Sequence, residues 1–113
     1  MKIIKNSGLI PEMKEDGRKI SSLLSYSFPN NRKVKLFLVT IPSGTHEKEH
    51  MHTDSEEIFF FLSSGKIIVN GETYNLEPKD IIIIEKKDKH KIIADQPIEM
   101  LGIKEEINDK VLI

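Results

Sequence analysis

Apolar residues along the chain come in short runs separated by turn-forming residues. Val34 to Ile41 is rich in β-branched and aromatic residues and ends at Pro-Ser-Gly, and Glu57 to Leu62 is apolar at nearly every position after its first. A short run of that second kind is typical of a strand buried on both faces. Asn70-Gly71 lies between two further runs and predicts a hairpin, because both central positions of a type I′ turn need positive φ.

The same pattern predicts strands over Arg18 to Ser25 and in three later runs, residues 81–85, 90–94 and 98–104. No segment shows clear helical periodicity except a short candidate helix over Lys104 to Leu112. Strands spaced by about ten residues predict an all-β domain, an antiparallel sandwich or barrel such as a jelly roll. We assign this domain to residues 18–113. Residues 1–17 are predicted to form an N-terminal arm with a short strand at Lys2 to Ile4.

Length and charge narrow the classes of protein to which the chain could belong. Its 113 residues suit one domain, and 17 basic against 18 acidic residues give no global field for binding nucleic acid or an anionic membrane. There is no apolar stretch of about 18 residues and no signal-peptide pattern at the N-terminus. No cysteine is present, which fits a reduced, cytoplasmic setting.

Three of the four histidines, His46, His50 and His52, fall within seven residues. On a strand, His50 and His52 would share a face roughly 6.5–7 Å apart, so that both imidazoles could bind one metal ion. Glu57 follows after a turn-prone Thr-Asp-Ser-Glu segment that could return it to the same side, and His90 could add a ligand from a neighbouring strand. The alternative is that this charged segment is only a solvated loop.

The spacing of these residues resembles the first motif of the cupin superfamily. That motif is Gly, five residues, His-x-His, three or four residues, Glu, six residues, Gly, and it matches Gly44, His50, His52 and Glu57. The closing glycine is displaced by one position, to Gly65. The family's commoner four-residue spacing favours Glu57 as the carboxylate, although Glu56 also satisfies the rule.

The second cupin motif is only partly present, and the resemblance spans about residues 34–103. Pro78, Asp80 and His90 stand at matching positions. Lys79 replaces a glycine of the motif. Glu85 and Lys87 stand where the motif has Pro-x-Gly. Ala94 stands where it has Asn.

The resemblance implies a small single-domain cupin, a β-barrel or jelly roll with a metal site inside it. The implied ligands are His50, His52, Glu57 and His90, which would hold one divalent ion: zinc, iron, manganese or nickel. His46 matches no family ligand and is predicted to lie at the rim or surface. Apolar pocket walls are predicted at Phe37, Val39, Phe59, Phe61, Ile92 and Met100, which a plain barrel core would also contain.

The implied function is that of a metal-dependent enzyme acting on a small polar or anionic metabolite, similar to sugar-phosphate isomerases or dioxygenases. The alternative is a non-catalytic module that binds or senses a small ligand. Lysines 86, 87, 89 and 91 either rim the pocket and attract anionic substrates or simply keep a loop soluble. Similar cupins form homodimers, and residues 19–28 could supply an intermolecular strand.

Overall fold

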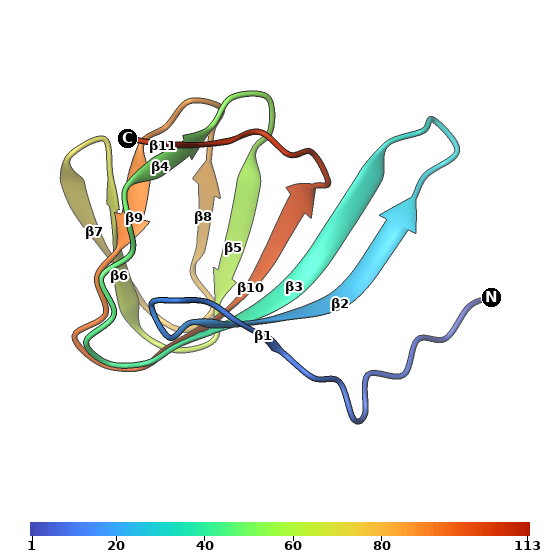
Figure 1. Ribbon diagram of the computed structural model, residues 1–113, viewed down its shortest axis with the longest axis horizontal. Helices are drawn as coiled ribbons and strands as arrows, with labels where there is room; N and C mark the ends of the chain where they lie inside the picture. Colours follow the sequence, from blue (N-terminus) through green and yellow to red (C-terminus); the bar gives the residue numbers. More distant parts are fainter.

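The computed structural model describes residues 1–113, which form eleven strands and no helix (Figure 1). The strands are β1 (Glu12–Met13), β2 (Lys19–Ser27), β3 (Lys33–Ile41), β4 (His50–His52), β5 (Glu57–Phe61), β6 (Gly65–Val69), β7 (Glu72–Leu76), β8 (Ile81–Ile84), β9 (His90–Ile92), β10 (Ile98–Glu105) and β11 (Lys110–Leu112). The predicted all-β class is confirmed.

The strands form two antiparallel sheets that face each other (Figure 1). The larger sheet has the order β1-β2-β3-β10-β5-β8, and the smaller has the order β11-β4-β9-β6-β7. The β2–β3 hairpin extends to one side beyond the smaller sheet. The two sheets are not closed into one hydrogen-bonded barrel, so the arrangement is that of a two-layer sandwich. No helix that could cross a membrane is found.

The core lies between the sheets because alternate strand residues point inward. Phe37, Val39 and Ile41 of β3 are buried in this way, as are Phe59 and Phe61 of β5. The rest of the apolar core comes from Ile67, Ile84, Ile92, Ala94, Ile98 and Met100. Their burial determines which face of each strand points into the space between the sheets.

The prediction that the strand at residues 57–62 is buried on both faces is wrong. Ile58 on its outer face is 36% exposed, and Phe60 is half-buried. The strand pairs with β10 and β8 and has the smaller sheet on one side only. Its outward isoleucine and phenylalanine therefore belong to an apolar outer surface of the larger sheet.

Gly102 of β10 gives the ring of Phe37 room in the core. Gly102 lies opposite Phe37 on β3 and opposite Phe59 on β5. A Cβ on Gly102 would stand 2.4 Å from two carbons of the Phe37 ring. The rings of Phe37 and Phe59 meet edge to face, 6.2 Å apart, above this glycine. The missing side chain thus sets how closely the Phe37 ring can approach the sheet.

The hairpin prediction is confirmed, and two predictions at the chain ends are wrong. Asn70 and Gly71 join β6 to β7 with φ values of 49° and 83°. Lys2 to Ile4 forms no strand, because its apolar residues are exposed and have no strand beside them. Residues 104–112 form no helix, since β10 continues to Glu105 and β11 then pairs with β4.

The residues that replace motif glycines keep the glycine conformation. Lys79 and Lys87 have φ values of 78° and 66°. Such a backbone costs a residue with a Cβ about 1–2 kcal/mol, although glycine loses more conformational entropy on folding. We expect Lys79→Gly or Lys87→Gly to raise the free energy of unfolding by about 0.5–1 kcal/mol in urea titrations. Lys86→Gly, at ordinary φ, should lower it, and equal losses in all three variants would contradict this account.

The predicted homodimer stays a prediction. Residues 19–28 largely coincide with β2, which pairs along its length with β3 of the same chain. Its other edge is covered by β1 only at Lys19 and Ile20. The remaining edge is free to pair with a second copy, and light scattering on the purified protein tests whether it does.

Candidate metal centre

The structure brings together the four residues that the sequence singled out. His50 and His52 lie on β4, His90 lies on β9, and Glu57 begins β5 of the facing sheet. His50 is the direct antiparallel partner of His90. One potential ligand atom of each of the four residues lies within 4.8 Å of all the others, and all four side chains are buried. The turn after His52 therefore does return Glu57 to the histidines.

Hydrogen bonds to backbone carbonyls orient two of the three imidazoles. Nδ1 of His50 lies 3.0 Å from the Lys48 carbonyl oxygen, and Nδ1 of His90 lies 2.9 Å from the Asp88 carbonyl oxygen. A carbonyl only accepts, so each of these nitrogens carries the hydrogen. Nε2 of each ring is then left as the nitrogen available to the cluster.

The donor atoms inside the cluster are close enough to share protons or a metal ion. Oε1 of Glu57 lies 2.9 Å from Nε2 of His52 and 3.2 Å from Nε2 of His90. If both histidines carry their hydrogen on Nδ1, two nitrogen lone pairs face a carboxylate oxygen, and only protons or a metal ion can hold such atoms together. Three imidazoles and one carboxylate form a donor set that suits divalent zinc, iron, manganese or nickel.

The electrostatics favour the protonation states that a metal requires at His50 and Glu57, whereas at His90 a metal would have to displace a proton. Burial lowers the pKa of the His50 imidazole to about 4. Burial alone would raise the pKa of Glu57, but hydrogen bonds from His52 and His90 outweigh it and bring that pKa to about 2. Burial alone would lower the pKa of His90, but the hydrogen bond to Glu57 outweighs it, so the pKa is raised. At neutral pH the cluster thus contains a neutral His50 and an ionised Glu57.

Asp109, just before β11, is a buried carboxylate that no pattern in the sequence singles out. Its Oδ1 lies 3.1 Å from Nδ1 of His52 and accepts a hydrogen bond from Lys104 Nζ at 3.1 Å. Its Oδ2 accepts from Ser55 Oγ at 2.7 Å and from the Asp54 backbone at 2.9 Å. Burial acts upward on its pKa, but these bonds outweigh it and hold the pKa below its usual value.

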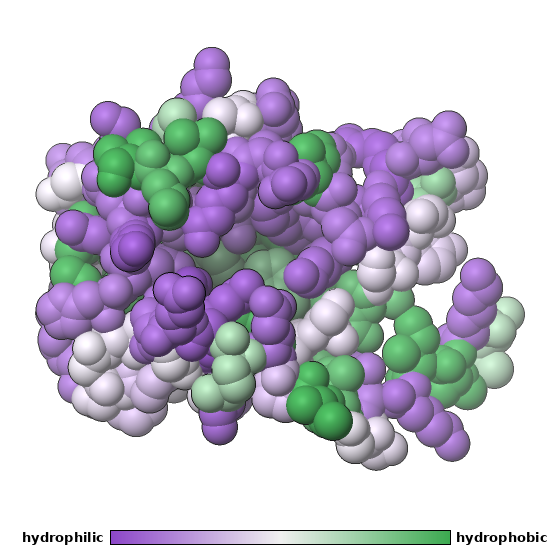
Figure 2. Space-filling view, in the orientation of Figure 1, coloured by the Kyte–Doolittle hydropathy of each residue, from purple (hydrophilic) through white to green (hydrophobic).

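A cavity of about 250 Å³ opens beside the cluster. Of the predicted apolar walls, Phe37, Val39, Phe59, Ile92 and Met100 line it, whereas Phe61 lies fully buried in the core. The hollow is visible near the centre of the largely hydrophilic face in Figure 2, with apolar atoms at its floor. The cavity is smaller than typical pockets for drug-sized ligands, roughly 300–1,000 Å³, and suits a small metabolite.

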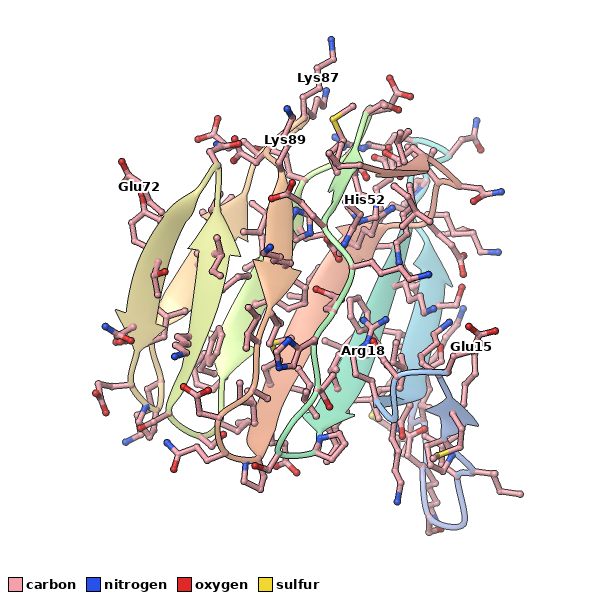
Figure 3. All side chains as sticks on the ribbon, turned by 60° about the vertical axis from the view of Figure 1, so that its left-hand side comes forward. Glu15, Arg18, His52, Glu72, Lys87 and Lys89 are labelled. Atoms are coloured by element: carbon pink, nitrogen blue, oxygen red, sulfur yellow. The ribbon has the colours of Figure 1, made fainter.

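Cations other than the predicted ones line the cavity. They are Lys14, Arg18, Lys35, Lys104 and Lys110. Lysines 86, 87, 89 and 91 do not line it, and Figure 3 shows Lys87 and Lys89 pointing away from the interior at one end of the molecule. These lysines flank or lie on β9, whose inward positions are taken by His90 and Ile92. The basic rim comes instead from the early strands and the C-terminal segment.

Arg18 and Glu47 form a buried ion pair in the cavity wall. Arg18 donates to Asp16 through Nε and to Glu47 through Nη1. The other oxygen of Glu47 accepts from the Ile92 backbone at 3.1 Å. Burial raises the pKa of Glu47, and Arg18 opposes the rise. Both oxygens of Glu47 are therefore occupied by the protein itself.

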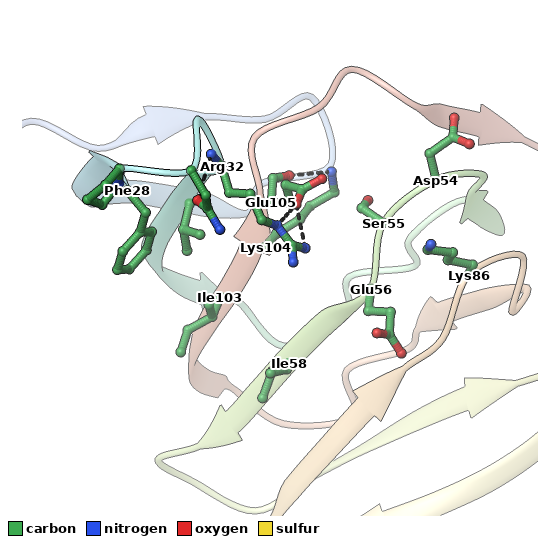
Figure 4. A pocket seen from close by; sticks show the side chains of 13 residues that line it. Phe28, Arg32, Asp54, Ser55, Glu56, Ile58, Lys86, Ile103, Lys104 and Glu105 are labelled. Carbon is green, nitrogen blue, oxygen red and sulfur yellow. Dashed lines mark hydrogen bonds and ion pairs between the residues drawn. The ribbon is translucent and has the colours of Figure 1, made fainter.

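The remaining candidates of the histidine segment lie outside the cavity. His46 is exposed, as predicted. Glu56 is also exposed and lines a separate groove of about 660 Å³ on the outer face of the larger sheet, together with Ile58 and Ile103 (Figure 4). The carboxylate that joins the histidines is thus Glu57.

Two comparisons of sequence agree with this picture. The family described as Cupin domain matches residues 37–104. Uncharacterized protein MJ1618 of Methanocaldococcus jannaschii is 32% identical over 106 residues, which are 89% of this chain and 85% of that protein. L-ectoine synthase of Vibrio campbellii is 32% identical over 73 residues, which are 64% of this chain and only 57% of the synthase.

Among solved structures, a predicted oxalate decarboxylase of Thermotoga maritima superposes with a TM-score of 0.79 at 19% identity. The match covers 94% of this chain and all of that one, and at this identity it shows a shared fold. The family match spans β4, β5 and β9 and most of β3 and β10, and so includes every strand of the histidine and carboxylate cluster. The chain belongs to the cupin family.

Proposed function

We propose that this protein is a metal-dependent enzyme acting on a small polar or anionic metabolite. One divalent ion would be held by His50, His52, Glu57 and His90. Such an ion supplies Lewis-acid polarisation of a substrate carbonyl or hydroxyl, or redox chemistry if it is iron. The observation that carries the proposal is the convergence of four buried ligand atoms within 4.8 Å beside a cavity.

The chain's own contribution is to hold the ligands and to shape the space beside them. The outward bonds of His50 and His90 fix the orientation of both rings. Apolar walls such as Phe37, Phe59 and Met100 exclude water from one side of a bound molecule. A small molecule is thereby held next to the cluster in a restricted orientation.

The relatives support an enzyme in a general way. One sequence relative is named L-ectoine synthase, although this chain spans little more than half of its length. A structural neighbour with a TM-score of 0.78 and 16% identity, RemF from Streptomyces resistomycificus, is named a polyketide cyclase. Both names describe catalysts built on this fold. An isomerase or a dioxygenase remains our choice of reaction class for this chain.

One observation favours a non-catalytic ligand-binding module as the second candidate. Besides Glu57, the cavity is lined by a single carboxylate, Glu47, and both of its oxygens are already bonded. No free carboxylate is left as a general base. If the protein is an enzyme, proton transfer and substrate activation therefore fall to the bound ion and its ligands.

Elemental analysis and product detection together test the proposal. Protein purified without a polyhistidine tag or chelator is expected to contain about one equivalent of a divalent metal. Incubation with sugar phosphates, or with carboxylates under oxygen if the metal is iron, should then give products detectable by NMR that disappear after chelation. No metal, even after divalent ions are added back, would contradict the metal site. Bound metal with saturable ligand binding but no product would favour the binding module.

A further inference from the structure

Lys35 is a cation on the inner face of the larger sheet. It lies on β3 two residues before Phe37 and shares the inward side of that strand. Its Nζ lies 5.6 Å from the centre of the Phe37 ring, and its side chain lines the cavity that also exposes the four-residue cluster. A charged residue at an inward position is costly unless something compensates its charge.

No carboxylate pairs with Lys35. The charge of Lys35 helps to lower the pKa of two carboxylates, Glu12 and Glu106. Each of them forms its ion pair with another lysine: Glu12 with Lys14 at 2.9 Å, and Glu106 with Lys33 at 3.0 Å. Lys35 forms no ion pair of its own among the residues of the structure. Its charge is therefore available to a bound molecule.

The strand register places a second cation directly beside it. Lys35 is the cross-strand partner of Lys104, and Lys104 is in turn the partner of Glu57. Like charges in directly opposite positions destabilise a sheet. Lys104 is neutralised by Asp109 and also donates to two backbone carbonyls. Lys35 has no equivalent partner, so an anion bound to it would relieve the repulsion.

The other cations of the cavity wall do not change this balance. Lys14 pairs with Glu12, and Arg18 pairs with Asp16 and Glu47. Lys110 is exposed at the rim and also has no ion pair. The cavity thus has one uncompensated positive charge on its inner wall and one at its rim.

We propose that Lys35 binds the distal carboxylate of a short dicarboxylic substrate whose other end lies at the four-residue cluster. This inference rests on the proposed function and specifies its substrate class. Lys35 and Glu57 stand two strand spacings apart, about 10 Å, with the apolar rings of Phe37 and Phe59 beside the space between them. A cavity of about 250 Å³ suits an oxo or hydroxy diacid of some five or six carbons.

Calorimetric titration of the metal-loaded protein with two matched acids tests this assignment. The probes are 2-oxoglutarate and 2-oxopentanoate, which share the 2-oxo acid end and differ only in the distal carboxylate. The wild-type protein should bind the diacid roughly tenfold more tightly, as expected for one charge-assisted hydrogen bond at a partly exposed site. Lys35→Met, which keeps an apolar stem against Phe37, should abolish that preference. Lys91→Met removes the same charge outside the cavity and should retain it.

The outcomes separate the two proposals. Metal content is measured on each sample, so a protein without metal overturns the proposed function and is recognised as such. With metal bound, equal affinity of the wild type for both acids overturns the role of Lys35, as does a preference that persists in Lys35→Met. Unchanged metal content and thermal unfolding in Lys35→Met would show that a lost preference is not due to misfolding.

Discussion

A variant that carries both His50→Ala and His90→Ala is expected to lose its bound metal, from about one equivalent to none. The two substitutions remove half of the candidate ligands, one from each of two paired strands. The remaining imidazole and carboxylate, His52 and Glu57, are too few to retain a divalent ion through purification, because protein sites of this kind use three or four ligands. Elemental analysis of tag-free protein measures the loss.

His46→Ala is the matched control for this experiment. It removes an exposed imidazole from the same segment and should leave the metal content unchanged. Because alanine at His50 and His90 leaves buried space, a second variant with glutamine at both positions preserves more of the volume. Circular dichroism establishes that each variant is folded. A folded double variant that retains a full equivalent of metal would show that the ion is bound elsewhere.

Asp109→Asn is expected to weaken metal binding by about 10–100-fold, the usual effect of losing a carboxylate that supports a histidine ligand. The Asp109 carboxylate holds Nδ1 of His52 at 3.1 Å and so fixes both the tautomer and the orientation of that ring. Asparagine has nearly the same size and can keep the bond from Ser55, but it supplies no negative charge to the imidazole. Competition with a chelator of known affinity gives the metal dissociation constant.

Asp54→Asn provides the control, since it makes the same chemical change at an exposed neighbouring carboxylate that contacts no histidine. Urea unfolding of both metal-free variants separates lost affinity from lost stability. If Asp109→Asn binds metal as tightly as Asp54→Asn does, the contact with His52 has no part in metal binding. A loss of affinity in proportion to the loss of stability would assign Asp109 a structural role only.

Local signals in the sequence were sufficient for most of the strands and for the candidate cluster. The His-x-His pair lies on one strand, so a period of two residues places both imidazoles on one face. Asn70-Gly71 encodes its hairpin through φ preferences alone. Periodicity could not choose between Glu56 and Glu57, because both faces of that strand are apolar. The family spacing favoured Glu57, and the structure brings Glu57 to the histidines.

What the sequence could not show depends on contacts between distant segments. The weak helical pattern of residues 104–112 is overridden by pairing: β10 continues to Glu105, and β11 forms a strand because β4 offers it an edge. Asp109 reaches His52 from 57 positions away, and no local pattern marks it. A signal for Lys35 did exist: it is a charged residue in series with Phe37 and Ile41 on the inward side of β3, which it shares with Lys33 at the end of the strand. Of the two interpretations of the lysines near His90, the structure excludes the pocket rim, because closeness in sequence to a ligand is not closeness to the cavity.

The glycine beneath the Phe37 ring has a consequence for how this scaffold can change. A methyl group at Gly102 would force the ring to swing away from the sheet, and the space it would enter is the cavity. The residue at position 102 therefore controls the length of the cavity, although it contacts neither the candidate ligands nor Lys35. Homologous chains with alanine or a larger residue at this point would accept shorter molecules while leaving the chemistry at the far end intact.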